Sequence, residues 1–360
     1  WSRTPWAMMQ SLGKVIRISV LVYTFSILII PETLNAQDAE VLFEGDTIEL
    51  DEVEITGGIT PEVYNQLART ITVISSEQIK NLPARSLHDL LEYSGNIDIR
   101  QRNTHGVQAD LQIRGGTFDQ VMVLLNGINI TDPQTGHFHL NIPVNQSSIE
   151  RIEILHGSGA RIYGANAYKG VVNIITRIDT NKLKAGIEYG DNKLFHSYAT
   201  ADLINQNYYQ SLSISTKSSG GYTSNTDYLM NNLYYQGGVK LSKVTLNIQG
   251  GFNGRKFGAN DFYSPRFPEQ YEEIQTAFGN MGLSTGKKIK LNTQIYWRQH
   301  NDRFLLIRND PEFYENIHRT NTYGLKTSTS FSSKAGKSYI GLENRIETIH
   351  STVLGNELKN

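Results

Sequence analysis

Residues 244–254, VTLNIQGGFNG, alternate apolar and polar side chains and decide the fold. Residues 289–298, IKLNTQIYWR, repeat the alternation. Successive side chains of a β-strand point to opposite faces of its sheet, so each segment predicts a strand with one apolar and one polar face. The first segment carries Val244, Leu246, Ile248 and Phe252 on its apolar face and Thr245, Asn247, Gln249 and Asn253 on its polar face.

The same two-residue period extends from about residue 182 to residue 350, without helical periodicity. It predicts nine strands, at residues 183–190, 195–203, 208–217, 229–241, 244–254, 272–284, 289–300, 317–331 and 337–350. Short turns near residues 205–206, 242–243, 285–288 and 333–336 alternate with long polar loops near residues 218–228, 255–271 and 301–316. Outer-membrane barrels have short periplasmic turns and long external loops, whereas a soluble β-sandwich, the alternative here, does not sort its loops by length.

We therefore predict that residues 181–360 form the first part of a transmembrane antiparallel β-barrel. Nine is an odd number of strands, and barrels with a plugged lumen have about 22. We expect further strands after residue 360, and unpaired sheet edges at Leu183 and near His350.

The composition agrees with many short strands. The 360 residues include 31 Gly, 19 Tyr and only 9 Pro, and aromatic residues make up 10%. The absence of Cys excludes disulfides, thiolate metal sites and Cys nucleophiles. A net charge of −1 gives no general attraction to nucleic acid, so no nucleic-acid partner is expected.

The N-terminal 36 residues resemble a secretory signal in their order of basic, apolar and small residues. Lys14 and Arg17 precede the apolar run at residues 18–30, and we expect cleavage after Ala36. An uncleaved anchor or a buried helix is the alternative. Residues 1–7 precede the first Met, so we expect translation to start at Met8 or Met9.

Residues 61–180 predict a small α+β domain. A strand is expected at residues 71–74, and helices are expected to begin after Ser75 and Ser86. Four later apolar segments predict buried strands, at residues 111–114, 121–125, 149–155 and 171–176.

Five motifs in this domain occur in a specific order. They are LQIRGG at 111–116, VMVLLNG at 121–127, IERIEILHG at 149–157, YGANA at 163–167 and GVVNIIT at 170–176. Together they resemble the plug domain of TonB-dependent outer-membrane receptors. The matching plug residues are Arg114, Gly115, Gly116, Asn126, Gly127, Gly157, Tyr163, Gly164 and Asn173. The resemblance implies a plug inside a 22-stranded barrel of the outer membrane, in contact with its lipid.

Two positions depart from the family pattern. Asn126 stands where Asp is usual, and HGSG at residues 156–159 replaces the commoner Arg-Gly-Pro. The glycines fit neither a dinucleotide-binding fingerprint nor a nucleophile elbow, and no catalytic set is visible, so we predict no enzyme activity.

Residues 37–60 predict an extended arm, in which DEVEIT at residues 51–56 resembles the TonB box. Its residues are Asp51, Glu52, Val53, Glu54, Ile55 and Thr56. An extended segment can add to the sheet edge of a partner through main-chain hydrogen bonds, and the resemblance implies that this partner is TonB with its inner-membrane energising complex. The alternatives are a plain first strand or linker, and a register at residues 46–48.

The resemblance places ligand contacts on plug apices, at residues 100–105, 116–120 and 131–140, and on the loop at residues 257–271. The candidates are Arg102, Asn103, His105, Asp119, Gln134, His137, His139, Phe262 and Tyr263. Residues 260–265, NDFYSP, resemble a loop of cobalamin receptors, and the alternative is simple packing of aromatic side chains among loops.

Metal ligands are a separate hypothesis. In an extended segment His137 and His139 would share a face and could bind a metal with His105, although a histidine pair without metal is the commoner arrangement. The resemblance suggests a structural calcium ion at Asp227, Asn260 and Asp261. No other cofactor is expected.

The function predicted from these features is energy-coupled uptake of a scarce large nutrient. Cobalamin or another corrinoid is the preferred ligand, and a ferric siderophore or haem is the alternative. A non-transporting barrel, such as an adhesin or a porin, is the alternative from a different class.

Overall fold

The computed structural model describes residues 54–55, 62–63, 70–157, 163, 165–176, 178, 180–286, 289–333, 336–354 and 357–359. The predicted signal and most of the arm, including Asp51–Val53 and Thr56, lie outside the described residues, as does Gly164. The remaining two residues of the predicted TonB box form β1 (Glu54–Ile55), which pairs antiparallel with β2 (Glu62–Val63).

The plug contains a five-stranded mixed sheet. In sheet order its strands are β3 (Ile71–Ile74), β8 (Arg151–His156), β9 (Gly170–Ile175), β6 (Val121–Leu125) and β7 (Ile128–Asn129). Only the β6–β9 pair is parallel. Strands β4 (Ile97–Arg102) and β5 (Gln108–Ile113) form a separate hairpin. The sequence predicted a strand at the position of β5 but none at the position of β4.

Both plug helices begin where the sequence predicts. The Oγ atom of Ser75 accepts from the Gln78 amide (3.3 Å) and the Gln78 side chain accepts from the Ser75 amide (2.9 Å), which caps α2 (Ser76–Asn81). Ser86 caps α3 (Leu87–Glu92) in a similar way. Four short 3-10 helices follow, η2 (Phe118–Gln120), η3 (Gly136–Phe138), η4 (Gln146–Ser148) and η5 (Ala165–Ala167). In the described part of the chain no helix is long and apolar enough to cross a membrane.

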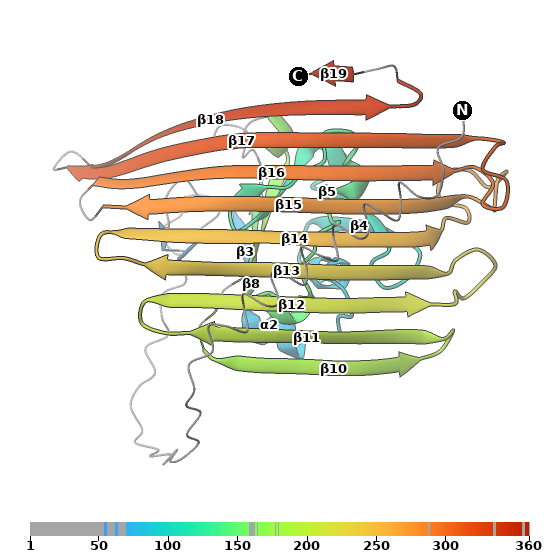
Figure 1. Ribbon diagram of the computed structural model, residues 1–360, viewed down its shortest axis with the longest axis horizontal. Helices are drawn as coiled ribbons and strands as arrows, with labels where there is room; N and C mark the ends of the chain where they lie inside the picture. The colour runs from blue at the N-terminus through green and yellow to red at the C-terminus, as the bar shows by residue number, and fades with distance from the viewer. Residues whose placement is uncertain are drawn as a thin grey trace, which may run out of the picture. The chain divides into compact units, whose positions relative to one another are not determined.

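The C-terminal half forms a ten-stranded antiparallel sheet whose strand order follows the sequence (Figure 1). Its strands are β10 (Lys182–Gly190), β11 (Leu194–Ile204), β12 (Tyr208–Ser219), β13 (Tyr228–Lys240), β14 (Val244–Gly258), β15 (Tyr271–Thr285), β16 (Ile289–Leu305), β17 (Glu315–Ser333), β18 (Gly336–Ser351) and β19 (Glu357–Lys359). The nine predicted strands are all present.

Three details of the prediction are wrong. Strands β14 and β16 run four and five residues further than expected, so Phe257 and Gly258 belong to a strand rather than to the ligand loop. The expected free edge near His350 pairs with Glu357 of the unpredicted strand β19. The long loops are correspondingly shorter than the polar composition suggested.

The two faces of the large sheet have opposite surroundings. On β14, Ile248 and Phe252 are 45% and 40% exposed, whereas the polar Gln249 and Asn253 are 9% and 0% exposed. A soluble protein buries its apolar face instead, so an apolar solvent is expected on the exposed side. On β14 the plug contacts the polar face, where Asn126 donates to Gln249 and Arg255 donates to the carbonyls of Gly106 and Val107.

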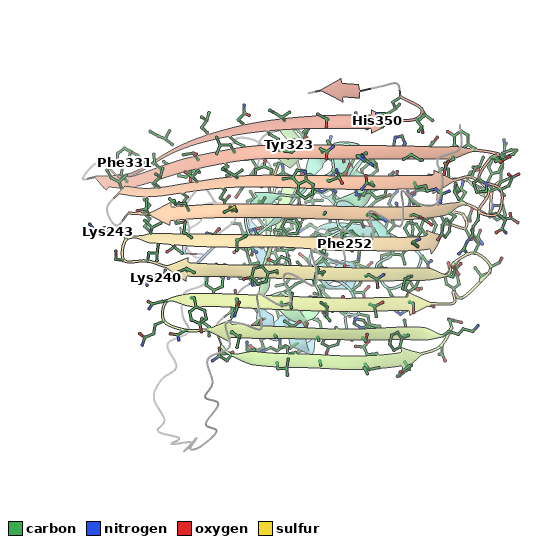
Figure 2. The ribbon with its side chains drawn as sticks, viewed as in Figure 1. Lys240, Lys243, Phe252, Tyr323, Phe331 and His350 are labelled. Atoms are coloured by element: carbon green, nitrogen blue, oxygen red, sulfur yellow. The ribbon has the colours of Figure 1, made fainter. Side chains whose placement is uncertain are left out.

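Figure 2 marks the two ends of this sheet. Lys240, Lys243 and Phe331 lie at the end with short turns, and His350 lies at the opposite end. Phe252 and Tyr323 lie between these ends. We refer to the end that carries the turns at residues 220–227, 259–270 and 306–314 as the loop end.

The plug and the large sheet share one core. Buried plug residues Leu90, Ile154 and Ile174 belong to the same apolar cluster as Tyr234 of β13 and Phe278 of β15. Apolar packing therefore holds the plug against the middle of the sheet, and its turns reach the loop end.

Candidate ligand-binding site

The plug motifs form tight turns in the structure. Arg114 and Gly115 have φ angles of 48° and 66°, and they reverse the chain after β5. Asn126 and Gly127, with φ angles of 50° and 79°, form the two-residue turn between β6 and β7, a geometry that favours Asn-Gly. The Asn173 side chain accepts a hydrogen bond from the Gly127 amide at 3.0 Å and fixes this turn.

Asn126 also joins the plug to the large sheet. Its Oδ1 atom accepts from the Thr176 amide at 2.9 Å, and its Nδ2 atom donates to Gln249 at 2.8 Å and lies 3.1 Å from the Tyr234 hydroxyl. A carboxylate could not donate these bonds. The departure from the usual Asp therefore replaces a charged group with an amide that bridges to β13 and β14.

The second departure, around His156, leaves other plug interactions intact. The His156 Nε2 atom lies 2.9 Å from the Thr72 hydroxyl, and burial together with the charge of Arg114 lowers the pKa of His156. On the same strand Arg151 pairs with Glu153 at 2.9 Å.

Several predicted ligand residues meet at the loop end, and we call Arg102, Asp110, His137, Phe262 and Tyr263 the loop-end cluster. Arg102 donates to the Phe262 carbonyl at 3.0 Å and to Asp110 at 2.9 Å. Its guanidinium carbon lies 5.2 Å from the centre of the Tyr263 ring, within cation–π range. The Nδ1 atom of His137 pairs with the other carboxylate oxygen of Asp110. Three plug segments and one barrel loop thus converge.

In the loop-end cluster the ionised Asp110 and Arg102 lie next to the partly exposed Tyr263. Burial would raise the pKa of Asp110, but the hydrogen bond and charge of His137 and the charge of Arg102 lower it overall. Tyr263 as a whole is 40% exposed, while its hydroxyl lies 2.9 Å from both Gln108 and Glu272. Burial of the hydroxyl and the Glu272 carboxylate raise the pKa of Tyr263. The cluster presents an aromatic surface with adjoining polar groups, as ligand pockets commonly do.

Two further candidates tie the β4–β5 turn to the next loop. Asn103 donates to the Thr226 carbonyl at 2.8 Å, and the His105 ring nitrogen lies 2.9 Å from the Tyr228 hydroxyl. Both residues have positive φ angles, of 66° and 57°. Asp119 is exposed on η2, where a Cβ atom on Gly136 would lie 3.1 Å from its carboxylate.

A buried polar group connects the plug to β16. Asp132 and Arg298 form an ion pair at 2.7 Å, and Gln134 donates to Asp302 at 3.3 Å. His139 is buried nearby, and desolvation lowers its pKa to about 4. The sequence reasoning missed Asp110, Asp132 and Arg298, although a charged residue on the polar face of a strand was a usable signal for Arg298.

The expected extended segment around His137 and His139 is wrong. His137 lies in η3 and His139 ends it, so the two side chains have different partners, and only His137 joins Asp110. Among the described residues, no group of three or more His, Asp or Glu side chains is arranged to hold a metal ion.

The calcium candidates have protein partners of their own. The Asp227 carboxylate accepts from both Arg308 guanidinium nitrogens, at 2.6 and 2.9 Å. Asn260 donates to the Ser224 carbonyl at 2.8 Å, and Asp261 has a φ angle of 66°. Calcium binding at these residues stays a prediction.

Comparisons with known proteins agree with this geometry. Residues 65–171 match the family described as TonB-dependent Receptor Plug Domain. The chain is 34% identical over 126 residues to the vitamin B12 transporter BtuB of Vibrio vulnificus strain CMCP6, a region that covers 35% of this chain and 20% of that protein. The BtuB of Vibrio vulnificus strain YJ016 is 23% identical over 299 residues, 81% of this chain and 47% of its own length.

Among solved structures, the siderophore receptor PiuA of Acinetobacter baumannii has the same fold. It superposes with a TM-score of 0.66 at 12% identity, over 86% of this chain and 50% of that one. The chain spans no more than about half the length of these relatives.

Proposed function

Because the chain belongs to the TonB-dependent receptor family of the outer membrane, we propose that it takes part in energy-coupled uptake of a scarce nutrient too large for a porin. Members of this family are receptors and transporters rather than enzymes. The ligand binds at the loop end, and a pull on the arm rearranges the plug to release it inward.

The loop-end cluster is the observation that carries this proposal. Arg102 ends strand β4 of the plug, His137 lies in η3 of the plug, and Tyr263 lies in a barrel loop. The affinity for a ligand that contacts all three therefore depends on the position of the plug. Rearrangement of the plug separates these groups and weakens the site. Because the plug and the barrel both contribute residues to the site, a movement of the plug that the arm causes also changes ligand affinity.

We favour a corrinoid as the ligand. Its flat macrocycle fits against an exposed aromatic ring, and its peripheral amides can exchange hydrogen bonds with the polar groups beside it. The similarity to vitamin B12 transporters supports this choice. A ferric siderophore or haem is the alternative.

Deletion of residues 51–56 tests the coupling. Uptake in cells that carry the full-length receptor should be lost, while surface binding of labelled ligand should persist. A matched deletion of six residues at 37–42 leaves the proposed TonB box in place and should keep uptake. Deletion of residues 46–48 separates the two possible registers. Unchanged uptake without residues 51–56 would rule out their role.

Binding titrations on the full-length protein test the ligand. Cyanocobalamin should bind with a micromolar or tighter dissociation constant, and Tyr263→Ala should weaken binding. Repeating the titration with calcium and with a calcium chelator tests the calcium prediction. Tight binding of a ferric siderophore without cobalamin binding would select the alternative.

A further inference from the structure

A cleft lies between the plug and strands β11–β14, and its lining includes no residue of the loop-end cluster. Its volume is about 100 Å³, well above the roughly 10–15 Å³ that one water molecule needs. Its lining includes three cationic residues, three histidines and three side-chain amides, which are Arg85, Lys217, Arg255, His88, His105, His196, Asn145, Gln146 and Asn232. The lining contains no Asp or Glu among the described residues.

The two cations on the barrel wall are bound only by neutral groups. Arg255 is buried and donates to the carbonyls of Gly106 at 3.0 Å and Val107 at 2.7 Å. Lys217 donates to the Arg85 carbonyl at 2.8 Å. Within the described part of the chain, neither cation has a carboxylate within ion-pair distance. Burying a cation without a counter-ion is costly, so the arrangement favours an anion that enters the cleft.

Two neighbouring carboxylates, Asp89 and Glu188, have partners of their own, and two of these partners, Arg85 and His196, line the cleft. Asp89 accepts from the Arg85 amide at 2.8 Å and from Gln101 at 3.0 Å. Glu188 lies 3.2 Å from a ring nitrogen of His196. Neither of these carboxylates lines the cleft.

His88 is the second, independent sign of a ligand. It is buried and lines the cleft, and neither of its ring nitrogens has a hydrogen-bond partner among the described residues. Burial and the charges of Arg255 and Lys217 lower the pKa of His88 to about 3, so the ring is neutral near pH 7. A neutral imidazole still carries one N–H donor, and an unused buried donor costs about 1–3 kcal/mol.

Gly106 makes room for this ring. It has a φ angle of 77°, and a Cβ atom there would lie 2.4 Å from the His88 Nδ1 atom. The chain therefore keeps the ring in the cleft by a backbone position that only glycine fills without strain.

We propose that this cleft is an oxyanion site, which receives a phosphate or carboxylate group on Lys217, Arg255 and His88. The group is either a free anion or part of the transported ligand. The second source rests on the proposed function, whereas the site itself does not.

The first test uses inorganic phosphate on the full-length receptor in detergent. Phosphate, at constant ionic strength, should raise the thermal midpoint of the wild type. Lys217→Met and His88→Phe should each reduce apparent phosphate affinity by about tenfold or more, because each removes a donor to the anion. Lys326→Met is the matched control, since Lys326 also reaches from the sheet to a plug carbonyl, that of Gly127 at 3.4 Å, but lies outside the cleft.

The outcomes are distinct. Loss of the phosphate response in Lys217→Met and His88→Phe, with a normal response in Lys326→Met, supports the site. No response in the wild type, or an equal response in Lys217→Met, overturns it.

The second test identifies the source of the anion, using cyanocobalamin, which carries a phosphodiester. Weaker binding to Lys217→Met than to Lys326→Met assigns the site to the ligand. Equal binding, together with a lost phosphate response, assigns it to a free anion. Failure of cobalamin to bind any variant rejects the preferred ligand without affecting the phosphate result.

Discussion

Replacing Asp132 with Asn removes the negative partner of the buried ion pair between the plug and β16. The side chains of Asp132 and Arg298 are 0% and 4% exposed, and their charged atoms lie 2.7 Å apart. The pKa of Asp132 is about 2, against an ordinary value of 3.8. Burial opposes this lowering, and the charges of Arg298 and His300 and the hydrogen bonds from Arg298 and Gln134 outweigh it.

The magnitude follows from these values. A shift of that size is worth about 2 kcal/mol, because one pKa unit corresponds to about 1.4 kcal/mol. Leaving the Arg298 guanidinium buried without a partner adds to the loss, and breaking buried pairs typically costs about 3–5 kcal/mol. We expect Asp132→Asn to weaken plug docking by about 2–4 kcal/mol.

Hydrogen–deuterium exchange on the full-length receptor measures this effect. Amides of β6 should exchange about 30-fold to about 1000-fold faster in Asp132→Asn than in the wild type, where exchange requires plug opening. Asp261→Asn, in an exposed loop, is the matched control. Removing both charges in Asp132→Asn with Arg298→Met should restore part of the protection, since no buried charge is then left unpaired.

The pH dependence of amide exchange gives an independent check that ionised Asp132 stabilises plug docking. Because the folded pKa is lowered, the stabilisation is present above about pH 4 and is lost as the pH falls towards 2. The difference in β6 amide exchange rate between the wild type and Asp132→Asn should therefore narrow as the pH falls from about 4 towards 2. Equal exchange in the two proteins near pH 7, or faster exchange in the double variant than in Asp132→Asn, would refute the reasoning.

Two further predictions concern the plug. Gly106→Ala should lower the thermal midpoint and reduce the free energy of unfolding of the full-length receptor by about 1–3 kcal/mol, because its φ angle is positive and its Cβ atom would clash with His88. Gly95→Ala is the control, because a Cβ atom there would meet no atom within 4 Å, and it should change the midpoint far less. Asn126→Ala should reduce the free energy of unfolding by about 1–3 kcal/mol and speed amide exchange at the β6–β7 turn, because it leaves buried groups of the plug and of β13 and β14 without partners. Unchanged exchange at that turn would show that these bonds do not hold it.

The strands of the large sheet could be predicted because their pattern is local. Alternation identifies a strand whichever element it pairs with, and in the barrel one face is uniformly apolar. The ends of β14 and β16 were missed because these strands continue past the apolar band into polar sequence, where composition suggests a loop. Phe257 shows the consequence, since it is fully buried against the plug rather than exposed in a loop.

The candidate site was only partly predictable, because its contacts depend on how the plug docks. The family resemblance identifies Arg102, His137 and Tyr263, but no local pattern marks Asp110 as the group that links the first two. Arg255 was assigned to a loop, although it lies on β14 and faces the plug. Asp110 lies 8 and 27 positions from Arg102 and His137, and Arg255 lies 149 positions from Gly106. In each case the pairing is set by tertiary packing, which local patterns do not report.

The character of the plug–sheet interface bears on the proposed uptake. Tyr234 and Phe278 supply apolar contact, but much of the interface consists of hydrogen bonds and an ion pair, such as those of Asn126, Asp132 and Arg255. Water can satisfy polar groups that separate, whereas exposed apolar surface has no such replacement, so a polar interface can open at lower cost. An arm that pulls on this plug therefore works against bonds that water can replace one at a time, which is the property that reversible release requires.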